Sequence, residues 1–226
     1  MVIPTPHTDA RRRSSCRDSP HPSGGPRRAA RSSRRRFPRR EGGGRVGLGR
    51  RMRSKLAGAS DWTEFVHDEL TGEILMEYTL VGGTFTIKAV NTWGLGLIST
   101  NREGTKRYFH FDGLGSTRAL TDSSEAVQDT YEYNAFGVLE SSTGSSTNPF
   151  RYVGQYGYYD DGAMGSASGL LLLGVRYYSP AHGRFWSWDP VPNLNLYGYV
   201  ENSATMAIDP GGLKPGNLFA KQYSPG

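Results

Sequence analysis

Two stretches of the chain share one pattern that decides the fold: YFHFDGLGS at residues 108–116 and YEYNAFG at residues 131–137. Each reads aromatic, any residue, aromatic, then Asp or Asn, with a Gly three residues later. Alternate aromatics of a strand lie on one face, and an Asx residue with a nearby Gly turns the chain into a hairpin. Because each hairpin leaves one apolar face open, neighbouring units are expected to stack and cover it, as in solenoid-like arrays.

The remaining sequence from residue 61 onward has a similar character. Runs rich in β-branched and aromatic residues, such as GEILMEYTL at 72–80 and GTFTIKAV at 83–90, alternate with Gly, Asn, Asp and Ser. Short runs of this kind between turn signals predict antiparallel hairpins in series and a mainly β fold. The stretch 195–207 is the one place where a short helix is expected, and Pro210 would end it.

The first 55 residues differ from the rest in composition and charge. They carry 16 Arg and one Lys against three acidic residues, a net charge of +14, which leaves −8 for the remainder of a chain whose total is +6. With almost no aromatic or β-branched side chains, this segment cannot bury enough apolar area to offset its ordering entropy, so a disordered tail is predicted. Its arginine runs can bind nucleic acid through phosphate charge, without specificity. A solvated tail and a misplaced start codon are the alternatives.

Composition also argues against several kinds of site. The single cysteine, Cys16, excludes an intrachain disulfide framework and an all-cysteine metal site. No run reaches the roughly 18 apolar residues of a transmembrane helix, and the N-terminus lacks the apolar region of a signal peptide. No cluster of His, Cys and Asp has the spacing of metal ligands, so neither a metal nor an organic cofactor is expected.

Five motifs, in sequence order, resemble those of bacterial Rhs/YD-repeat proteins. HFDGLGSTR at 110–118 resembles a segment of the Rhs repeat-associated core, and the stretch 131–137 is similar to the YD repeat with Asn in place of Asp. VRYYSPAHGRF at 175–185 resembles RYYDPxxGRF with Ser in place of Asp, and NLYGYVEN at 195–202 and DPGGL at 209–213 complete the signature. On these motifs the chain is identified as an RHS repeat-associated core, the C-terminal end of a polymorphic-toxin shell.

This resemblance implies a fold, an activity and partners. Members of the family build a hollow β-cocoon from many YD hairpins, and an aspartyl autoprotease within the core cuts the chain just after the DPxGL motif. Carried over to this sequence, the catalytic residues are Arg176, Asp189 and Asp209, and the scissile bond joins Leu213 to Lys214. The expected partners are the remaining shell or a delivery apparatus, and a secreted or cell-surface location is expected.

The residue types suit that chemistry. Two carboxylates held close together cannot both ionise cheaply, so one keeps a proton and acts as acid while the other acts as base on a water. Arg176 can orient a carboxylate or stabilise an oxyanion, and Gly211 and Gly212 allow the backbone to bend toward Asp189. Taken alone, each residue has an ordinary interpretation, because Asp-Pro pairs are common in turns and an arginine in a strand is commonly a paired surface residue.

The sequence also departs from the family pattern. DPVP at 189–192 lacks the usual Gly, and the segment from there to Asp209 is a few residues short, which changes the spacing of the two carboxylates. Only 214–226 follow the expected cut, too few for a toxin domain, so missing cargo or an orphan remnant is expected. The domain prediction is an Arg-rich tail (1–55), the core (56–213) and a short tail after the cut (214–226).

Two alternatives to a single-turnover aspartyl autoprotease stay open. The first is a non-catalytic β module for adhesion or glycan contact, in which four tyrosines that are expected to be exposed stack on sugars: Tyr152, Tyr156, Tyr158 and Tyr159. The second is a decayed orphan copy. His110 fills an aromatic position of the repeat and is expected to be packed or hydrogen-bonded rather than to act as a general base.

Overall fold

The computed structural model describes residues 45–46, 50–55, 59–162, 169–191, 195–213 and 215–217, which all lie within one compact unit, Pro38–Gly226. In this part of the chain antiparallel β-sheets dominate and every helix is a 3-10 turn of three residues, so the predicted mainly β class is confirmed. No helix among the described residues has the length and apolar character that crossing a membrane requires.

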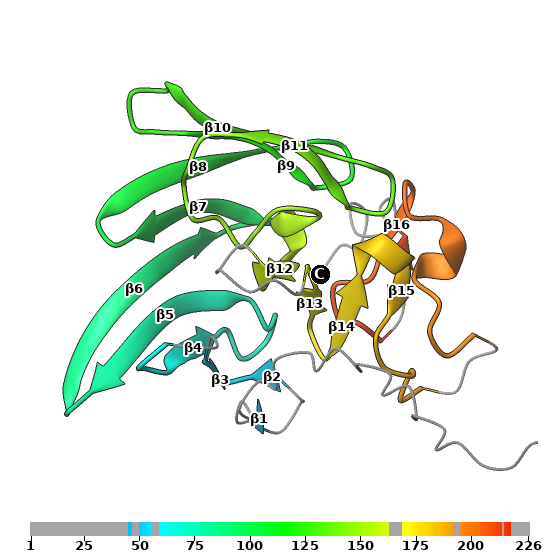
Figure 1. Cartoon of the computed structure of the whole chain (residues 1–226), viewed down its shortest axis with the longest axis horizontal. Helices are drawn as coiled ribbons and strands as arrows, with labels where there is room; N and C mark the ends of the chain where they lie inside the picture. Colours follow the sequence, from blue (N-terminus) through cyan, green and yellow to red (C-terminus); the bar gives the residue numbers. More distant parts are fainter. Residues whose placement is uncertain are drawn as a thin grey trace, which may run out of the picture. The chain divides into compact units, whose positions relative to one another are not determined.

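The largest sheet of the described residues contains nine strands, and each is antiparallel to its neighbour. Its strands are β3 (Arg53–Ser54), β4 (Thr63–His67), β5 (Ile74–Val81), β6 (Thr84–Trp93), β7 (Leu97–Arg102), β8 (Thr105–Phe111), β9 (Thr117–Thr121), β10 (Val127–Tyr133) and β11 (Leu139–Thr143). Neighbours in the sheet are also neighbours in the sequence, so the sheet is a series of hairpins, as the sequence predicts (Figure 1).

Smaller elements follow and precede this sheet. A four-stranded sheet is formed by β12 (Tyr159–Asp160), β13 (Leu171–Leu173), β14 (Arg176–Ser179) and β15 (Arg184–Phe185). Two-stranded sheets join β1 (Arg45–Val46) to β2 (Arg50–Arg51) and β16 (Ala207–Ile208) to β17 (Gly216–Asn217). The 3-10 turns are η1 (Gly154–Tyr156), η3 (Pro180–His182) and η4 (Val200–Asn202).

The turns of the two repeat units have the same geometry. Asp112 Oδ1 accepts hydrogen bonds from the backbone N–H groups two and four residues later, at 3.0 and 2.9 Å. Asn134 Oδ1 does the same at 3.0 Å for each bond. A third turn of this kind, which the sequence did not reveal, is built on Asp122 at 2.8 and 3.2 Å, with Glu125 at φ 67° where the other two turns have Gly.

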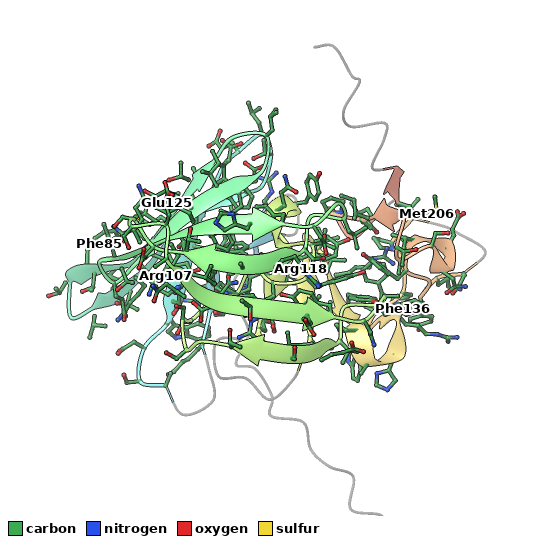
Figure 2. The ribbon with its side chains drawn as sticks, turned by 90° about the horizontal axis from the view of Figure 1, so that it is seen from above. Phe85, Arg107, Arg118, Glu125, Phe136 and Met206 are labelled. Carbon is green, nitrogen blue, oxygen red and sulfur yellow. The ribbon has the colours of Figure 1, made fainter. Side chains whose placement is uncertain are left out.

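Glycine is required in the two repeat turns for a second reason. Gly115 and Gly137 both have a φ of 90°, and a Cβ at these positions would overlap the rings of Tyr156 and Tyr152. The repeat turns therefore receive aromatic side chains from the segment that follows the large sheet. Phe136, labelled in Figure 2, lies in one of these turns, and its carbonyl oxygen accepts a hydrogen bond from the hydroxyl of Tyr178, 2.8 Å away.

Two apolar cores hold the sheets together. One core packs β12 and β13 against one face of the large sheet and contains the repeat aromatics Phe109 and Tyr131, which are buried as the pattern predicts. The other lies in the C-terminal part and consists of Tyr152, Val153, Tyr158, Leu171, Leu173, Tyr178, Phe185, Tyr199, Val200, Ala204 and Ile208. The aromatic motifs after residue 150 therefore build a core of their own.

The burial of three tyrosines corrects the expectation that they are exposed. Tyr152, Tyr158 and Tyr159 are 2%, 0% and 2% exposed, and Tyr156 is partly buried against the C-terminal core. Tyr158 and Tyr199 join their hydroxyl groups at 2.9 Å. Tyrosines that fill a core in this way cannot stack on a sugar.

Two further expectations differ from the structure. Within 195–207 the only helical element is η4, because its three residues all have positive φ, which L-residues do not sustain in an α-helix. Within the predicted tail, Arg45–Val46, Arg50–Arg51 and Arg53–Ser54 are strands, and Arg51 is buried because it pairs with Asp161 at 2.7 Å. The remainder of the predicted tail, 1–44 and 47–49, lies outside the described residues, and so do Lys214 and 218–226.

Candidate active site

Three segments that are separate in the sequence bring the predicted site residues together. Arg176 is the first residue of β14, Asp189 lies in the loop that follows β15, and Asp209 directly follows β16. The side chains of Arg176, Asp189 and Asp209 are 4%, 7% and 2% exposed. The three groups therefore form a buried cluster rather than a set of surface charges.

Arg176 is the centre of this cluster. Its Nη2 lies 3.0 Å from Asp189 Oδ2 and 3.4 Å from Asp209 Oδ2, so a single nitrogen contacts both carboxylates. Its Nε donates a hydrogen bond to the carbonyl oxygen of Gly212. The guanidinium carbon lies 3.6 Å from the centre of the Phe185 ring, and within the described part of the chain Nη1 is buried without a hydrogen-bond partner.

Asp209 is fixed through its backbone and its side chain. Its backbone N–H donates to the hydroxyl oxygen of Tyr158 at 2.7 Å. Its Oδ1 accepts a hydrogen bond from the backbone N–H of Leu213 at 3.0 Å, and its carbonyl oxygen accepts one from Gly212 at 3.1 Å. The DPGGL segment therefore forms a turn in which the N–H of its last residue, Leu213, contacts the carboxylate of its first residue, Asp209.

Asp189 reaches the cluster in spite of the unusual DPVP segment. Its Oδ1 accepts a hydrogen bond from the N–H of Val191 at 2.9 Å, and its own N–H donates to Leu196 O at 2.8 Å. The first oxygen therefore caps the local turn while Oδ2 is directed to Arg176. The shortened loop still brings both carboxylates to one guanidinium.

The DPGGL segment lies directly on the turn between β13 and β14. Val175 N–H donates to Gly211 O at 3.2 Å, and a Cβ at Gly212 would overlap the carbonyl oxygen of Leu173. Gly212 has a φ of 63°, which also favours glycine. The second glycine of the motif therefore permits the close approach that brings the Gly212 carbonyl to Arg176.

The charges of the cluster do not balance if both carboxyl groups are ionised. One guanidinium against two carboxylates leaves one negative charge in a site that is almost closed to water, and a buried unbalanced charge is costly. Burial raises the pKa of the neighbouring Tyr158 hydroxyl well above its ordinary value, so this group stays protonated and accepts the Asp209 N–H without adding charge.

Two residues of the site were missed by sequence reasoning. Phe185 lies under the guanidinium of Arg176, and Tyr158 positions the backbone of Asp209. Phe185 belongs to the GRF motif, but nothing in the sequence connects Tyr158 to Asp209.

His110 does not belong to the site. It lies on β8, where its Nε2 is 2.9 Å from Thr121 Oγ1, so it is hydrogen-bonded as the sequence predicts. Among the described residues no group of three or more His, Cys, Asp or Glu could hold a metal ion.

Comparison with known proteins gives several partial matches, although no family model matches the chain. The tRNA3(Ser)-specific nuclease WapA of Bacillus spizizenii is 34% identical over 126 residues, which cover 51% of this chain and 5% of WapA. Toxin subunit YenC1 of Yersinia entomophaga is 30% identical over 158 residues, which cover 64% of this chain and 15% of YenC1. The chain spans only a small part of the length of these relatives.

Solved structures have the same fold. The crystal structure of TcdB2-TccC3 is similar with a TM-score of 0.56 at 22% identity, over 75% of this chain and 9% of that one. The described part of this chain therefore shares its β-rich fold with part of that structure. Together with the sequence relatives, the match shows that the chain contains an Rhs/YD-repeat toxin shell-like region related to WapA and YenC1.

Proposed function

We propose that this segment of an Rhs/YD-repeat polymorphic-toxin shell protein cleaves its own backbone once, between Leu213 and Lys214. The observation that supports the proposal is that Arg176 and Asp209 both contact the peptide group that joins Gly212 to Leu213, while Asp189 contacts the same guanidinium. Two buried carboxyl groups that share one proton are the arrangement that acid–base hydrolysis by aspartates requires.

In the proposed reaction a water attacks the carbonyl carbon of Leu213, and one ionised carboxylate takes a proton from that water. The other carboxyl group gives its proton to the amide nitrogen of Lys214 as the C–N bond breaks. The products are a carboxyl group on Leu213 and an amino group on Lys214. One water is consumed, and the proton has moved from one aspartate to the other.

Arg176 has two roles in this proposal. Through Nη2 and Nε it holds both carboxylates and the carbonyl of Gly212, which places the peptide bond that follows. Its Nη1 has no hydrogen-bond partner in the described structure, and we assign it as the donor to the oxyanion that develops on Leu213. A charged donor in a site that excludes water stabilises such an oxyanion more strongly than it would in water.

The proposal extends to the rest of the protein. The relatives are many times longer than the part that this chain matches, so the remaining shell is the partner that we propose for the large sheet. In this arrangement 56–213 is the repeat-associated core, to which Arg50–Ser54 is added, and the residues after 213 are the segment that cleavage separates. The nine-stranded hairpin series supports this, because it has the form of a cocoon fragment.

A purely structural role of the same residues is the second candidate. The ion pairs of Arg176 tie β14 to the loops that follow β15 and β16, which by itself stabilises the fold. The glycan-contact alternative loses its basis, because three of the four tyrosines that it uses are buried. The intact mass of the whole chain, beside that of an Asp209→Asn variant, separates self-cleavage from a structural role.

A further inference from the structure

A cavity of about 460 Å³ lies next to the proposed cleavage site. Its walls come from β2, from the start of β5, from β13 and from the 210–213 loop, and they include Arg51, Ile74, Leu172 and Leu213. Ile74 and Leu172 are buried apolar residues of the core between the nine-stranded and the four-stranded sheet. The cavity thus combines apolar walls with a cationic side chain, and the residue before the proposed cut forms part of its lining.

In the described structure Arg51 forms hydrogen bonds through only one nitrogen of its guanidinium, Nη1. Nη1 lies 2.7 Å from Asp161 Oδ1 and 3.3 Å from the hydroxyl of Tyr177, while the guanidinium carbon lies 4.7 and 4.8 Å from the ring centres of Phe65 and Tyr159. In the described structure Nε and Nη2 are buried without a hydrogen-bond partner. These two nitrogens share one edge of the guanidinium, which is the fork that binds a carboxylate through two parallel hydrogen bonds.

The position of this fork is fixed by its surroundings. The aromatic rings and Asp161 hold the guanidinium in place, and His67 Nε2 lies 2.8 Å from the carbonyl oxygen of Arg51 itself. Arg50 is occupied elsewhere, since its Nη1 donates to the backbone oxygens of Asp68 and Glu69. Two buried donors that are left unsatisfied cost free energy, so an anion that reaches them gains both hydrogen bonds and charge neutralisation.

We propose that this edge of Arg51 binds the α-carboxylate that cleavage creates on Leu213. The inference rests on the proposed function, because the intact chain has no carboxylate at this position. The chemistry of the two partners matches: a C-terminal leucine carries an apolar side chain for Ile74 and Leu172 and a carboxylate for the fork. Binding of the new chain end would keep the product in place and oppose resealing of the bond.

The test uses the full-length Asp209→Asn chain, in which the cavity is not filled by a product, and the peptide acetyl-Gly-Gly-Leu as a probe. We expect the free acid of this peptide to bind at least about tenfold more tightly than its C-terminal amide in calorimetric or NMR titration, since only the acid makes the paired charge-assisted bonds. Arg51→Lys should remove this preference, whereas Arg53→Lys, on the exposed neighbouring strand, should keep it. Equal affinity of acid and amide for the chain with Arg51 intact would overturn the proposal.

The outcome is separable from that of the cleavage experiment. If the parent chain does not cleave itself while the Asp209→Asn chain prefers the acid, the proposed function is contradicted and a carboxylate site at Arg51 remains. A chain that cleaves but shows no preference for the acid would support the function and contradict the site. In the cleaved parent the new chain end already occupies the fork, so the free acid should bind more weakly than to the Asp209→Asn chain.

Discussion

Asp209 Oδ1 accepts a hydrogen bond from the backbone N–H of Leu213, with 3.0 Å between the two atoms. The same peptide group is held at its other end, because Arg176 Nε donates to the carbonyl oxygen of Gly212. The Gly212–Leu213 peptide is therefore fixed by two of the residues to which we assign the chemistry. A change at either residue will move the carbonyl of Leu213, which is the group that the proposed reaction attacks.

Arg176→Lys should slow self-cleavage by about a hundredfold or more, because a lysine cannot contact both carboxylates, the Gly212 carbonyl and the oxyanion at once. The measurement is the fraction of cleaved chain over time after purification of the folded protein. Arg184→Lys is the matched control, since Arg184 is exposed on the neighbouring strand β15. Equal slowing in the two variants would contradict a specific role of Arg176.

Glu77→Ala should destabilise the fold by about 3–5 kcal/mol, because it leaves the largely buried guanidinium of Arg102 without its partner. Glu77 is fully buried and meets Arg102 through two bonds of 2.8 and 3.0 Å. Urea denaturation of the full chain measures the difference. The exposed pair of Lys88 with Glu103 is the control, and Glu103→Ala should change stability by less than about 1 kcal/mol. Similar losses of unfolding free energy in the two variants would contradict a larger contribution from the Glu77–Arg102 pair.

Alkaline solution should destabilise the C-terminal core. Burial raises the pKa of Tyr152 to about 12 and that of Tyr158 well above its ordinary value of 10.0. The folded chain therefore retains protons that the unfolded chain releases, so stability is complete below about pH 10 and falls as the pH rises toward 12. Melting temperature and tyrosinate absorbance, followed together, test this: ionisation of all tyrosines near pH 10 in a folded chain would contradict it.

The large sheet could be predicted because the residues that specify each of its hairpins lie close together in the sequence. An aromatic, any residue, an aromatic and an Asx-x-x-Gly turn specify a strand face and a reversal within eight residues, and Phe109 and Tyr131 are buried accordingly. The Asp122 turn has the same hydrogen bonds but was not recognised, because Glu125 adopts positive φ in place of glycine. The hydrogen bonds of this turn can therefore form without the glycine that usually marks the turn in the sequence.

The repeat turns should depend on the acceptor oxygen rather than on the amide. Asn134→Ala removes two hydrogen bonds from backbone N–H groups and should cost about 1–2 kcal/mol. Asn134→Asp restores the residue of the common YD pattern, keeps both bonds, and should change stability by less than about 0.5 kcal/mol. Urea denaturation of both variants is the measurement, and an equal loss for Asp and Ala would contradict this explanation.

The rest of the molecule depends on contacts that are distant in the sequence. Arg51 looked like part of a disordered tail, but it is buried by its pairing with Asp161, which is 110 residues away. In the candidate site, the motifs suggested Arg176, Asp189 and Asp209, whereas Tyr158 gave no signal because its contact with Asp209 spans 51 residues. Composition describes a segment on its own and cannot show which partner it will find in the folded chain.

The most direct test is the intact mass of the full-length chain, purified at neutral pH and confirmed to be folded by circular dichroism, beside Asp209→Asn and Asp189→Asn. Asp122→Asn, in an exposed repeat turn, is the matched control. Self-cleavage predicts that the parent and the control lose residues 214–226 and end at Leu213, while both site variants keep their full mass. A folded parent that keeps its full mass would contradict self-cleavage and leave the Arg176 cluster with a structural role alone.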